Sequence, residues 1–279
     1  MENIAESSKH SNLYLRILTA SVGLPGVLAL VYLASTSVLR LAFLCLVVRT
    51  AYEFARLVQP QSSDYPSYAW QTRCLIITAF TFFTASSAST SHSMVALLAT
   101  GIIAAAIFGT LGQISVHKRA SSSLNALFVV TYPVLTWLAI WLLAEKSRDM
   151  LALVLVSAWV SDSGAFFIGR RWGKHKMAPD VSPHKTWEGA AAGFTFSIVA
   201  TFLFELYRSP VNNWFLFLYI APASAFAAQI GDLFKSIFKR QAGGKDAGML
   251  LPGHGGLIDR VDSVLLSGVV IWALLIFLH

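Results

Sequence analysis

The chain has 279 residues, of which 56% are hydrophobic and 13% charged, with a mean hydropathy of +0.62 and a formal net charge of +7. Soluble domains are typically about 45–50% apolar and about 25% charged, so this composition excludes an ordinary soluble domain and predicts a membrane-embedded protein. The two cysteines, Cys45 and Cys74, lie in apolar stretches without the spacing of a disulfide framework or a zinc site. We expect the basic residues to meet the bilayer and phosphate groups, with no nucleic acid among the partners.

Apolar stretches of membrane-spanning length recur along the whole chain. A bilayer core about 30 Å thick requires about 20 mainly apolar residues for each spanning helix, so the sequence predicts an all-α polytopic integral membrane protein with about nine transmembrane helices. The stretches that carry this prediction are residues 13–34, 37–57, 72–90, 93–112, 123–144, 150–169, 186–207, 214–238 and 257–278. Pro25, Pro133 and Pro222 lie inside them and are expected to kink the helices, which a membrane bundle tolerates because neighbouring helices re-satisfy the freed carbonyl groups.

The distribution of Lys and Arg predicts how these helices are oriented. With the N-terminus in the cytoplasm and the C-terminus on the opposite side, all but four of the 21 Lys and Arg residues lie in or beside cytoplasmic segments, as the positive-inside rule favours. The exceptions are Arg40, Lys146, Arg148 and Arg208. A short N-terminal tail and compact connections favour a bacterial inner membrane, with an organellar origin as the alternative.

Two cytoplasmic segments, residues 170–185 and 239–256, are longer and more polar than the other connections, which are short turns. We expect the function to reside in these two segments. The chain is accordingly divided into residues 1–149, the first five helices as a lipid-facing scaffold, and residues 150–279, the last four helices with the catalytic site and both cytoplasmic loops.

Carboxylates gather in the second of these parts. Seven of the 14 acidic residues fall at cytoplasmic ends of the last four predicted helices: Asp162, Asp180, Glu188, Asp232, Asp246, Asp259 and Asp262. A carboxylate so close to hydrocarbon is costly and normally faces a protein interior or a wet cavity, which indicates a functional site. The alternative is a set of solvated charges at the membrane interface.

The residues Asp232, Lys235, Ser236 and Lys239 follow one another at intervals of three, one and three. In a helix this spacing places them in a single polar stripe, opposite an apolar face. One carboxylate and two ammonium groups are therefore expected to face the same cleft.

Asp259 and Asp262 are three residues apart and lie near one another if the last helix begins around Leu257. The ends of the last two helices are then expected to hold one cation between them. Oxygen ligands without nearby cysteine or paired histidine favour Mg²⁺, which takes one or two carboxylates together with water and substrate phosphate. This pattern predicts a nucleotide or polyphosphate partner.

The connection between these two helices is rich in glycine, over residues 243–246 and 252–256. Glycines let backbone N–H groups approach an anion closely, and the nearby side chains of Lys239, Lys245 and Arg260 are expected to neutralise it. The alternative is a flexible turn whose basic residues bind anionic lipid.

Several motifs resemble the phosphatidate cytidylyltransferase family, also called CDP-diacylglycerol synthases. Residues 236–240, 245–246 and 254–262, which read SIFKR, KD and HGGLIDRVD, are similar to the signature of that family in order and spacing. Residues 182–189 (SPHKTWEG) resemble its Ser-Pro-Lys-Lys-Thr-x-Glu-Gly element, and residues 162–166 (DSGAF) its Asp-Thr-x-Ala-Tyr element. Ser163, Phe166 and His184 depart from the commoner residues. The resemblance is strong over residues 150–279.

This resemblance implies a membrane enzyme of phospholipid biosynthesis that transfers CMP from CTP to phosphatidic acid, giving CDP-diacylglycerol and pyrophosphate. It implies Mg²⁺ as cofactor, with a monovalent cation such as K⁺ as a candidate helper, and often a homodimer. The metal ligands are then Asp232, Asp259 and Asp262. The catalytic residues are Asp232, Lys239, Asp246, Asp259, Arg260 and Asp262. The substrate-binding residues are Ser182, Lys185, Thr186, Ser236, Arg240, Lys245, His254, Gly255 and Gly256.

Two other functions remain open from the sequence. A CTP-dependent polyprenol or phytol kinase also needs nucleotide and metal at a membrane site, but it releases CDP. An ion-coupled transporter would place its carboxylates near the bilayer midplane, whereas these cluster at one face. The roles of Asp162, Glu188 and His254 are left open, and Glu53 is expected to pair with Arg49 or Arg56, which lie four and three residues away.

Overall fold

The computed structural model describes Gly23 and residues 25–58, 67–88, 90–110, 116–208, 214–242 and 256–277. Its helices are α2 (Thr36–Val58), α3 (Ser67–Ala85), α4 (Ser91–Thr110), α5 (Val116–Lys146), α6 (Arg148–Trp172), α7 (Trp187–Arg208), α8 (Trp214–Gln241) and α9 (Ile258–Phe277). Strands β1 (Lys176–Ala178) and β2 (Ser182–Thr186) form a small antiparallel hairpin between α6 and α7. The helical prediction is confirmed, with this hairpin as an addition.

Each predicted apolar stretch from residue 37 onward overlaps one of these helices. Half of the first stretch, residues 13–34, lies outside the described residues, and within the other half residues 25–33 are helical. By length and composition, five of the described helices are able to cross a membrane: the stretches Ser91–Phe108, Arg119–Lys146, Arg148–Trp172, Trp187–Tyr207 and Ile258–Phe277.

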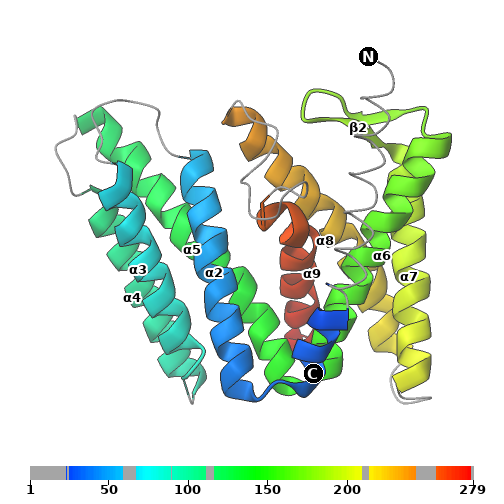
Figure 1. The fold of residues 1–279 in the computed structure, drawn as a ribbon, viewed down its shortest axis with the longest axis horizontal. Coiled ribbons are helices and arrows are strands. Elements are labelled where there is room, and N and C mark those ends of the chain that lie inside the picture. Colours follow the sequence, from blue (N-terminus) through cyan, green and yellow to red (C-terminus); the bar gives the residue numbers. More distant parts are fainter. Residues whose placement is uncertain are drawn as a thin grey trace, which may run out of the picture.

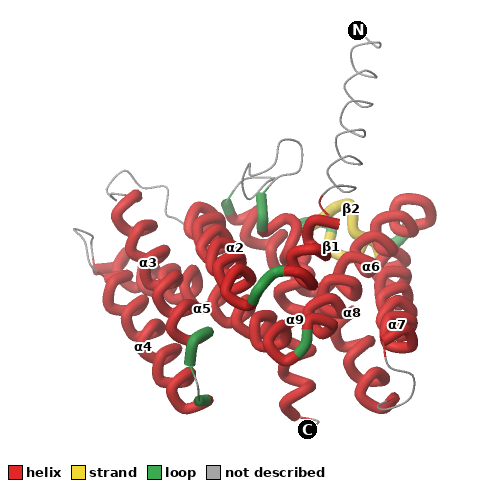
Figure 2. The backbone as a smooth tube through the Cα atoms, turned by 60° about the horizontal axis from the view of Figure 1, so that its bottom comes forward, coloured by secondary structure: helices red, strands yellow, loops and turns green. Residues whose placement is uncertain are grey.

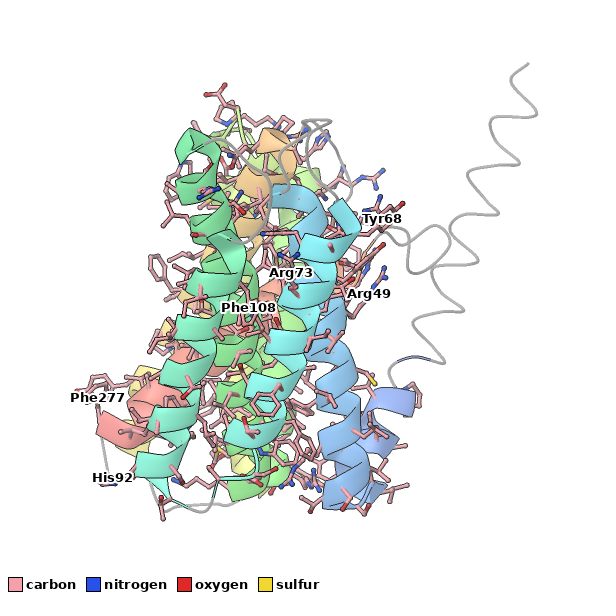
Figure 3. The ribbon with its side chains drawn as sticks, turned by 90° about the vertical axis from the view of Figure 1, so that its left-hand side faces the viewer. Arg49, Tyr68, Arg73, His92, Phe108 and Phe277 are labelled. Carbon is pink, nitrogen blue, oxygen red and sulfur yellow. The ribbon has the colours of Figure 1, made fainter. Side chains whose placement is uncertain are left out.

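The outer surface is apolar, as a lipid environment requires. Ile76, Val95 and Leu203, on α3, α4 and α7, are 63%, 61% and 57% exposed. Large apolar side chains exposed over several neighbouring helices are unfavourable in water and are satisfied by acyl chains. Figure 3 shows such side chains projecting from the bundle, with Phe108 and Phe277 among them.

The helices run side by side and alternate in direction, so that the ends of α2, α6 and α8 and the hairpin lie at the same end of the bundle, the upper end in Figure 1. Figure 2 shows the hairpin, in yellow, beside α6. The opposite end carries the start of α4, where Figure 3 labels His92. The hairpin and the end of α8 therefore lie at one end of the bundle.

Helix α9 lies in the middle of the bundle, in contact with α5 on one side and with α6 and α8 on the other. Its buried Leu265 and Ile271 share one core with Ile140 and Trp141 of α5 and Val47 of α2. Burial of large apolar side chains around α9 fixes its axis in the bundle, which matters because α9 carries Asp259 and Asp262.

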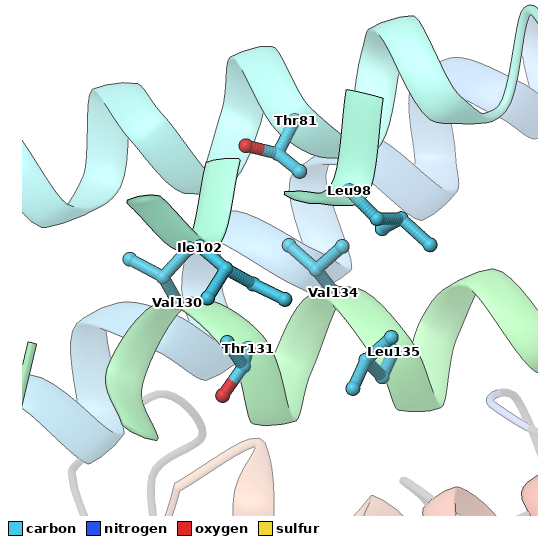
Figure 4. Close-up of a pocket in the computed structure, with 7 residues that line it drawn as sticks. All are labelled: Thr81, Leu98, Ile102, Val130, Thr131, Val134 and Leu135. Carbon is cyan, nitrogen blue, oxygen red and sulfur yellow. The ribbon is translucent and has the colours of Figure 1, made fainter. Parts of the chain in front are cut away.

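Among the described residues, a small apolar pocket lies between α3, α4 and α5 (Figure 4). It is lined by Thr81, Leu98, Ile102, Val130, Thr131, Val134 and Leu135. These side chains offer two hydroxyl groups and no charge, so the pocket has no chemistry for a phosphate or a metal.

Candidate active site

The two helices that carry the predicted metal ligands come into close contact at Gly231. A Cβ atom at this position would collide with the backbone carbonyl oxygen of Asp262 and lie 3.0 Å from its carbonyl carbon. Glycine at residue 231 therefore allows α8 and α9 to approach until Asp232 and Asp262 become neighbours.

We expect Gly231→Ala to push α8 away from α9 and to destabilise the protein by about 1–3 kcal/mol, because the obstacle is backbone and has little freedom to move. Thermal unfolding of the purified protein in detergent measures this effect. The matched control is Gly26→Ala, where an added Cβ meets nothing within 4 Å. Equal unfolding midpoints for the two variants would contradict the close contact.

Three carboxylates surround the ammonium group of Lys235. Its Nζ lies 2.9 Å from Oδ1 of Asp232, 2.6 Å from Oδ2 of Asp262 and 3.6 Å from Oδ1 of Asp259. The side chain of Lys235 is only 9% exposed, whereas that of Asp232 is 32% exposed. The cluster is therefore buried on the side of α9 and accessible to solvent at Asp232.

A second lysine of α8 extends the cluster toward the start of α9. Lys239 Nζ donates to Oδ1 of Asp259 at 2.9 Å, and the backbone N–H of Gly256 donates to Oδ2 of the same carboxylate at 3.1 Å. Both oxygens of Asp259 are therefore occupied, and the side chain is held against the first turn of its own helix.

The hairpin contributes a third lysine from a distant part of the sequence. Lys185 Nζ, on β2, lies 2.7 Å from Oδ2 of Asp232. Arg240, near the end of α8, donates from Nε to the backbone oxygen of Val181 at 3.0 Å. The first contact joins β2 to α8, and the second joins α8 to the turn before β2. Strand β2 therefore lies beside Asp232, the exposed carboxylate of the cluster.

The base of the hairpin is closed by contacts with the start of α7. The backbone N–H of Trp187 donates to the oxygen of His175 at 2.9 Å, and Nδ1 of His175 lies 2.6 Å from Oε1 of Glu188. The hydroxyl of Thr186 accepts from the N–H of Gly189 at 3.2 Å. Glu188 and Thr186 therefore shape the hairpin rather than face the carboxylate cluster.

A fourth carboxylate approaches from α6. The hydroxyl of Ser263, the residue after Asp262, lies 2.9 Å from both carboxylate oxygens of Asp162. This contact joins α6 to α9 next to the cluster. Asp162 is therefore a neighbour of the metal-ligand candidates, although its role was left open from the sequence.

The structure brings together five of the residues selected from the sequence: Asp232, Asp259, Asp262, Lys185 and Lys239. Ser236 instead donates to the backbone oxygen of Asp232 at 2.8 Å, as serines inside helices often do. Ser182 is half-buried on β2, and Arg260 is exposed in the first turn of α9. Lys245, Asp246, His254 and Gly255 lie outside the described residues.

Two residues at this site, Lys235 and Glu53, were not assigned a role in it from the sequence. Lys235 was placed on the polar stripe of α8, and its spacing from Asp232 is the signal that identifies it. Glu53, on α2, is fully buried and accepts hydrogen bonds from the backbone N–H groups of Leu257 and Ile258 at 2.9 and 2.8 Å. Its expected pairing with Arg49 is also present, at 2.9 Å.

The donor set of the cluster fits a hard divalent cation. Within the described residues, no group of three or more His, Cys, Asp or Glu side chains is arranged to hold a metal ion by itself. The carboxylates of Asp232, Asp259 and Asp262 instead meet around one positive charge, the Lys235 ammonium. Mg²⁺ commonly takes one or two carboxylates and fills its other positions with substrate phosphate and water, which this cluster could provide.

Comparison with known proteins shows the family of this chain. The model of the cytidylyltransferase family matches residues 14–278, nearly the whole chain. The chain belongs to the cytidylyltransferase family. The resemblance read from the motifs of α8 and α9 is thereby confirmed at the level of the family.

Curated relatives of the chain are named phosphatidate cytidylyltransferases. The protein of Haemophilus influenzae is 41% identical over 119 residues, which is 41% of each chain. The protein of Thermotoga maritima is 37% identical over 155 residues, 54% of this chain and 57% of the relative. That of Bacillus subtilis is 44% identical over 111 residues, 39% of this chain and 41% of the relative. The aligned stretches thus span about half the length of these relatives.

Proposed function

We propose that the protein is a phosphatidate cytidylyltransferase, which transfers CMP from CTP to phosphatidic acid and yields CDP-diacylglycerol and pyrophosphate. The observation that carries this proposal is the meeting of Asp232, Asp259 and Asp262 around Lys235 at one end of a membrane bundle. Membership of the cytidylyltransferase family supports it.

In this reaction a phosphate oxygen of phosphatidic acid attacks the α-phosphorus of CTP, a new P–O bond forms, and the bond to pyrophosphate breaks. The nucleophile is already an anion, so no general base is needed. Catalysis then consists of positioning two anions and neutralising the charges that repel one another. Lys185, Lys235 and Lys239 face the cluster from two elements and are suited to hold the triphosphate.

Asp232, Asp259 and Asp262 would hold Mg²⁺, with K⁺ as a candidate second cation. Bound Mg²⁺ supplies positive charge to the phosphates of CTP and to the departing pyrophosphate. To admit it, the Lys235 ammonium has to move away from at least one of its carboxylates and toward a phosphate. CTP would then approach from the side of Asp232, whose side chain is the most exposed of the three carboxylates.

The remaining assignments are part of the same proposal. Arg260 and Asp246 complete the catalytic group. Substrate binding is assigned to Ser182, Arg240, Lys245, His254, Gly255 and Gly256, whereas Thr186 and Ser236 contribute by holding the hairpin and α8 in shape. The catalytic groups belong to residues 150–279, and residues 1–149 act as the scaffold against which α9 packs.

The proposal includes nine transmembrane helices, a cytoplasmic N-terminus and a C-terminus on the other side of a bacterial inner membrane. The cluster then faces the cytoplasm, where CTP is dissolved, while phosphatidic acid keeps its acyl chains in the bilayer. The exposed apolar side chains around the bundle are consistent with this placement. A homodimer is part of the proposal as well.

The deciding experiment incubates the purified protein with CTP labelled at the α-phosphate and either phosphatidic acid or a polyprenol, with Mg²⁺ or with excess EDTA. We expect labelled CDP-diacylglycerol and unlabelled pyrophosphate only when Mg²⁺ is present. Release of labelled CDP with phosphorylation of a polyprenol would identify a kinase instead. Absence of any nucleotide product, with substrate uptake in vesicles, would identify a transporter.

Lys239→Ala is expected to weaken the binding of CTP. Loss of this ammonium removes one positive charge from the cluster, and a tenfold rise in the KM for CTP corresponds to about 1.4 kcal/mol. Initial rates over a range of CTP concentrations measure the effect, and Lys174→Ala, an exposed lysine at the same end of the bundle, serves as control. If Lys239→Ala leaves the KM for CTP unchanged, its assignment is wrong.

A further inference from the structure

The carboxylate of Glu53 connects the two parts of the chain at the beginning of α9. It is 204 residues from Leu257 in the sequence, and its side chain is fully buried. Oε1 accepts the N–H of Leu257 at 2.9 Å and Oε2 accepts the N–H of Ile258 at 2.8 Å. One side chain of α2 therefore holds two successive backbone groups at the start of α9.

These groups are among the N–H donors that have no partner inside a helix at its N-terminus. Ile258 is fully buried, so its N–H depends on Glu53 rather than on water, whereas Leu257 is half-buried. A negative charge at this position is also favoured by the dipole of α9. Glu53 thus serves as an N-terminal cap that comes from another helix.

Arg49 fixes the orientation of this cap. Its guanidinium contacts Oε1 of Glu53 through Nη2 at 2.9 Å and Nε at 3.0 Å, one turn earlier on α2. A buried carboxylate is tolerated only when it is paired and hydrogen-bonded, and Glu53 is both. Its two oxygens are therefore held in one arrangement relative to α9.

The start of α9 is also where the carboxylate cluster begins. Gly256 donates its N–H to Asp259, Leu257 and Ile258 donate theirs to Glu53, and Asp262 lies one turn further along. Rotation or sliding of α9 by part of a turn would move Asp259 and Asp262 away from Lys235. The bonds to Glu53 oppose both movements.

We propose that Glu53, oriented by Arg49, is a positioning residue that fixes the rotation and the axial position of α9 and thereby the geometry of Asp259 and Asp262. This inference rests on the proposed function, because it assigns Glu53 a part in cation binding and turnover. Glu53 lies in residues 1–149, so the geometry of the site also depends on the scaffold.

The test is Glu53→Gln, which keeps size and shape. Glutamine has one acceptor oxygen, and its NH₂ group would face a backbone N–H, so one of the two bonds is lost. We expect faster hydrogen exchange at Leu257 and Ile258. We also expect about a 10–100-fold weaker binding of Mn²⁺, used as the probe and followed by electron paramagnetic resonance, and a similar fall in kcat. The KM for CTP should change less than kcat, because the three lysines that are proposed to hold the triphosphate, Lys185, Lys235 and Lys239, lie on β2 and α8.

Glu145→Gln is the matched control, because Glu145 also pairs with an arginine of α2, Arg40, at 3.7 Å, but at the opposite end of the bundle. It should change none of these measurements. If Glu53→Gln fails to fold, Arg49→Gln, which removes a 30% exposed side chain, is measured in its place and should show the same changes in smaller degree.

Unchanged exchange at Leu257 and Ile258 would overturn the inference. Faster exchange with the Mn²⁺ affinity and kcat of wild type would also overturn it, because Glu53 would then be a purely structural cap. If the wild-type protein makes no CDP-diacylglycerol, the proposed function fails, while exchange and Mn²⁺ binding still decide whether Glu53 positions α9.

Discussion

Asp232→Asn is expected to reduce cytidylyl transfer by about a hundredfold to a thousandfold, because it weakens the binding of the cation that would stabilise the developing negative charge. Asp232 is the most exposed carboxylate of the cluster and contacts both Lys185 and Lys235, at 2.7 and 2.9 Å. Asparagine keeps the shape of the side chain but loses its charge. The substitution therefore weakens the proposed metal site and also removes the ion pairs that orient the two lysines.

The measurement is kcat with saturating CTP and phosphatidic acid in mixed micelles, over a range of Mg²⁺ concentrations. Asp149→Asn is the matched control, because Asp149 lies in the first turn of α6 at the opposite end of the bundle. The control should retain wild-type turnover, and both variants should insert into the membrane normally. Near-normal turnover of Asp232→Asn would refute its assignment as a metal ligand.

Lys235→Met is expected to have the second large effect, on stability as well as on activity. Removing one partner of a buried ion pair typically costs about 3–5 kcal/mol, because the remaining charge is left uncompensated. Here three carboxylates would lose the cation that they share. We therefore expect a markedly lower unfolding temperature in EDTA and loss of cytidylyl transfer.

Addition of Mg²⁺ should distinguish this loss from an ordinary packing defect. A divalent cation between the carboxylates replaces the missing positive charge, so Mg²⁺ should raise the unfolding temperature of Lys235→Met more than that of wild type. Lys146→Met, at the exposed end of α5, should show no such dependence. Equal effects of Mg²⁺ on both lysine variants would argue against a cation site at this cluster.

The helices could be predicted from the sequence because their formation depends on local properties. Hydrogen bonds inside each helix and the length of each apolar stretch identified α2 to α9 with boundaries that differ by at most about seven residues. The same local rule placed Asp232, Lys235 and Lys239 on one face of α8, where the ion pairs with Asp259 and Asp262 now place them. Spacing along one helix is sufficient for such conclusions.

The hairpin was not predicted, because β1 and β2 have three and five residues and no clear alternation of apolar side chains. Its contribution to the site depends on Arg240, whose contact with Val181 spans 59 residues of sequence. The contact between Lys185 and Asp232 arises only once the hairpin is joined to α8. No periodic pattern contains this information.

Composition, helix positions and the residues available for phosphate and metal chemistry were therefore properties of the sequence alone, since each follows from neighbours within a few turns. Which side chains meet was determined by packing between helices. The contact of Gly231 with Asp262 sets how near α8 comes to α9, and Glu53 binds the start of α9 from the far part of the chain. Such contacts depend on close packing of whole elements, which the local periodicity of a sequence does not specify.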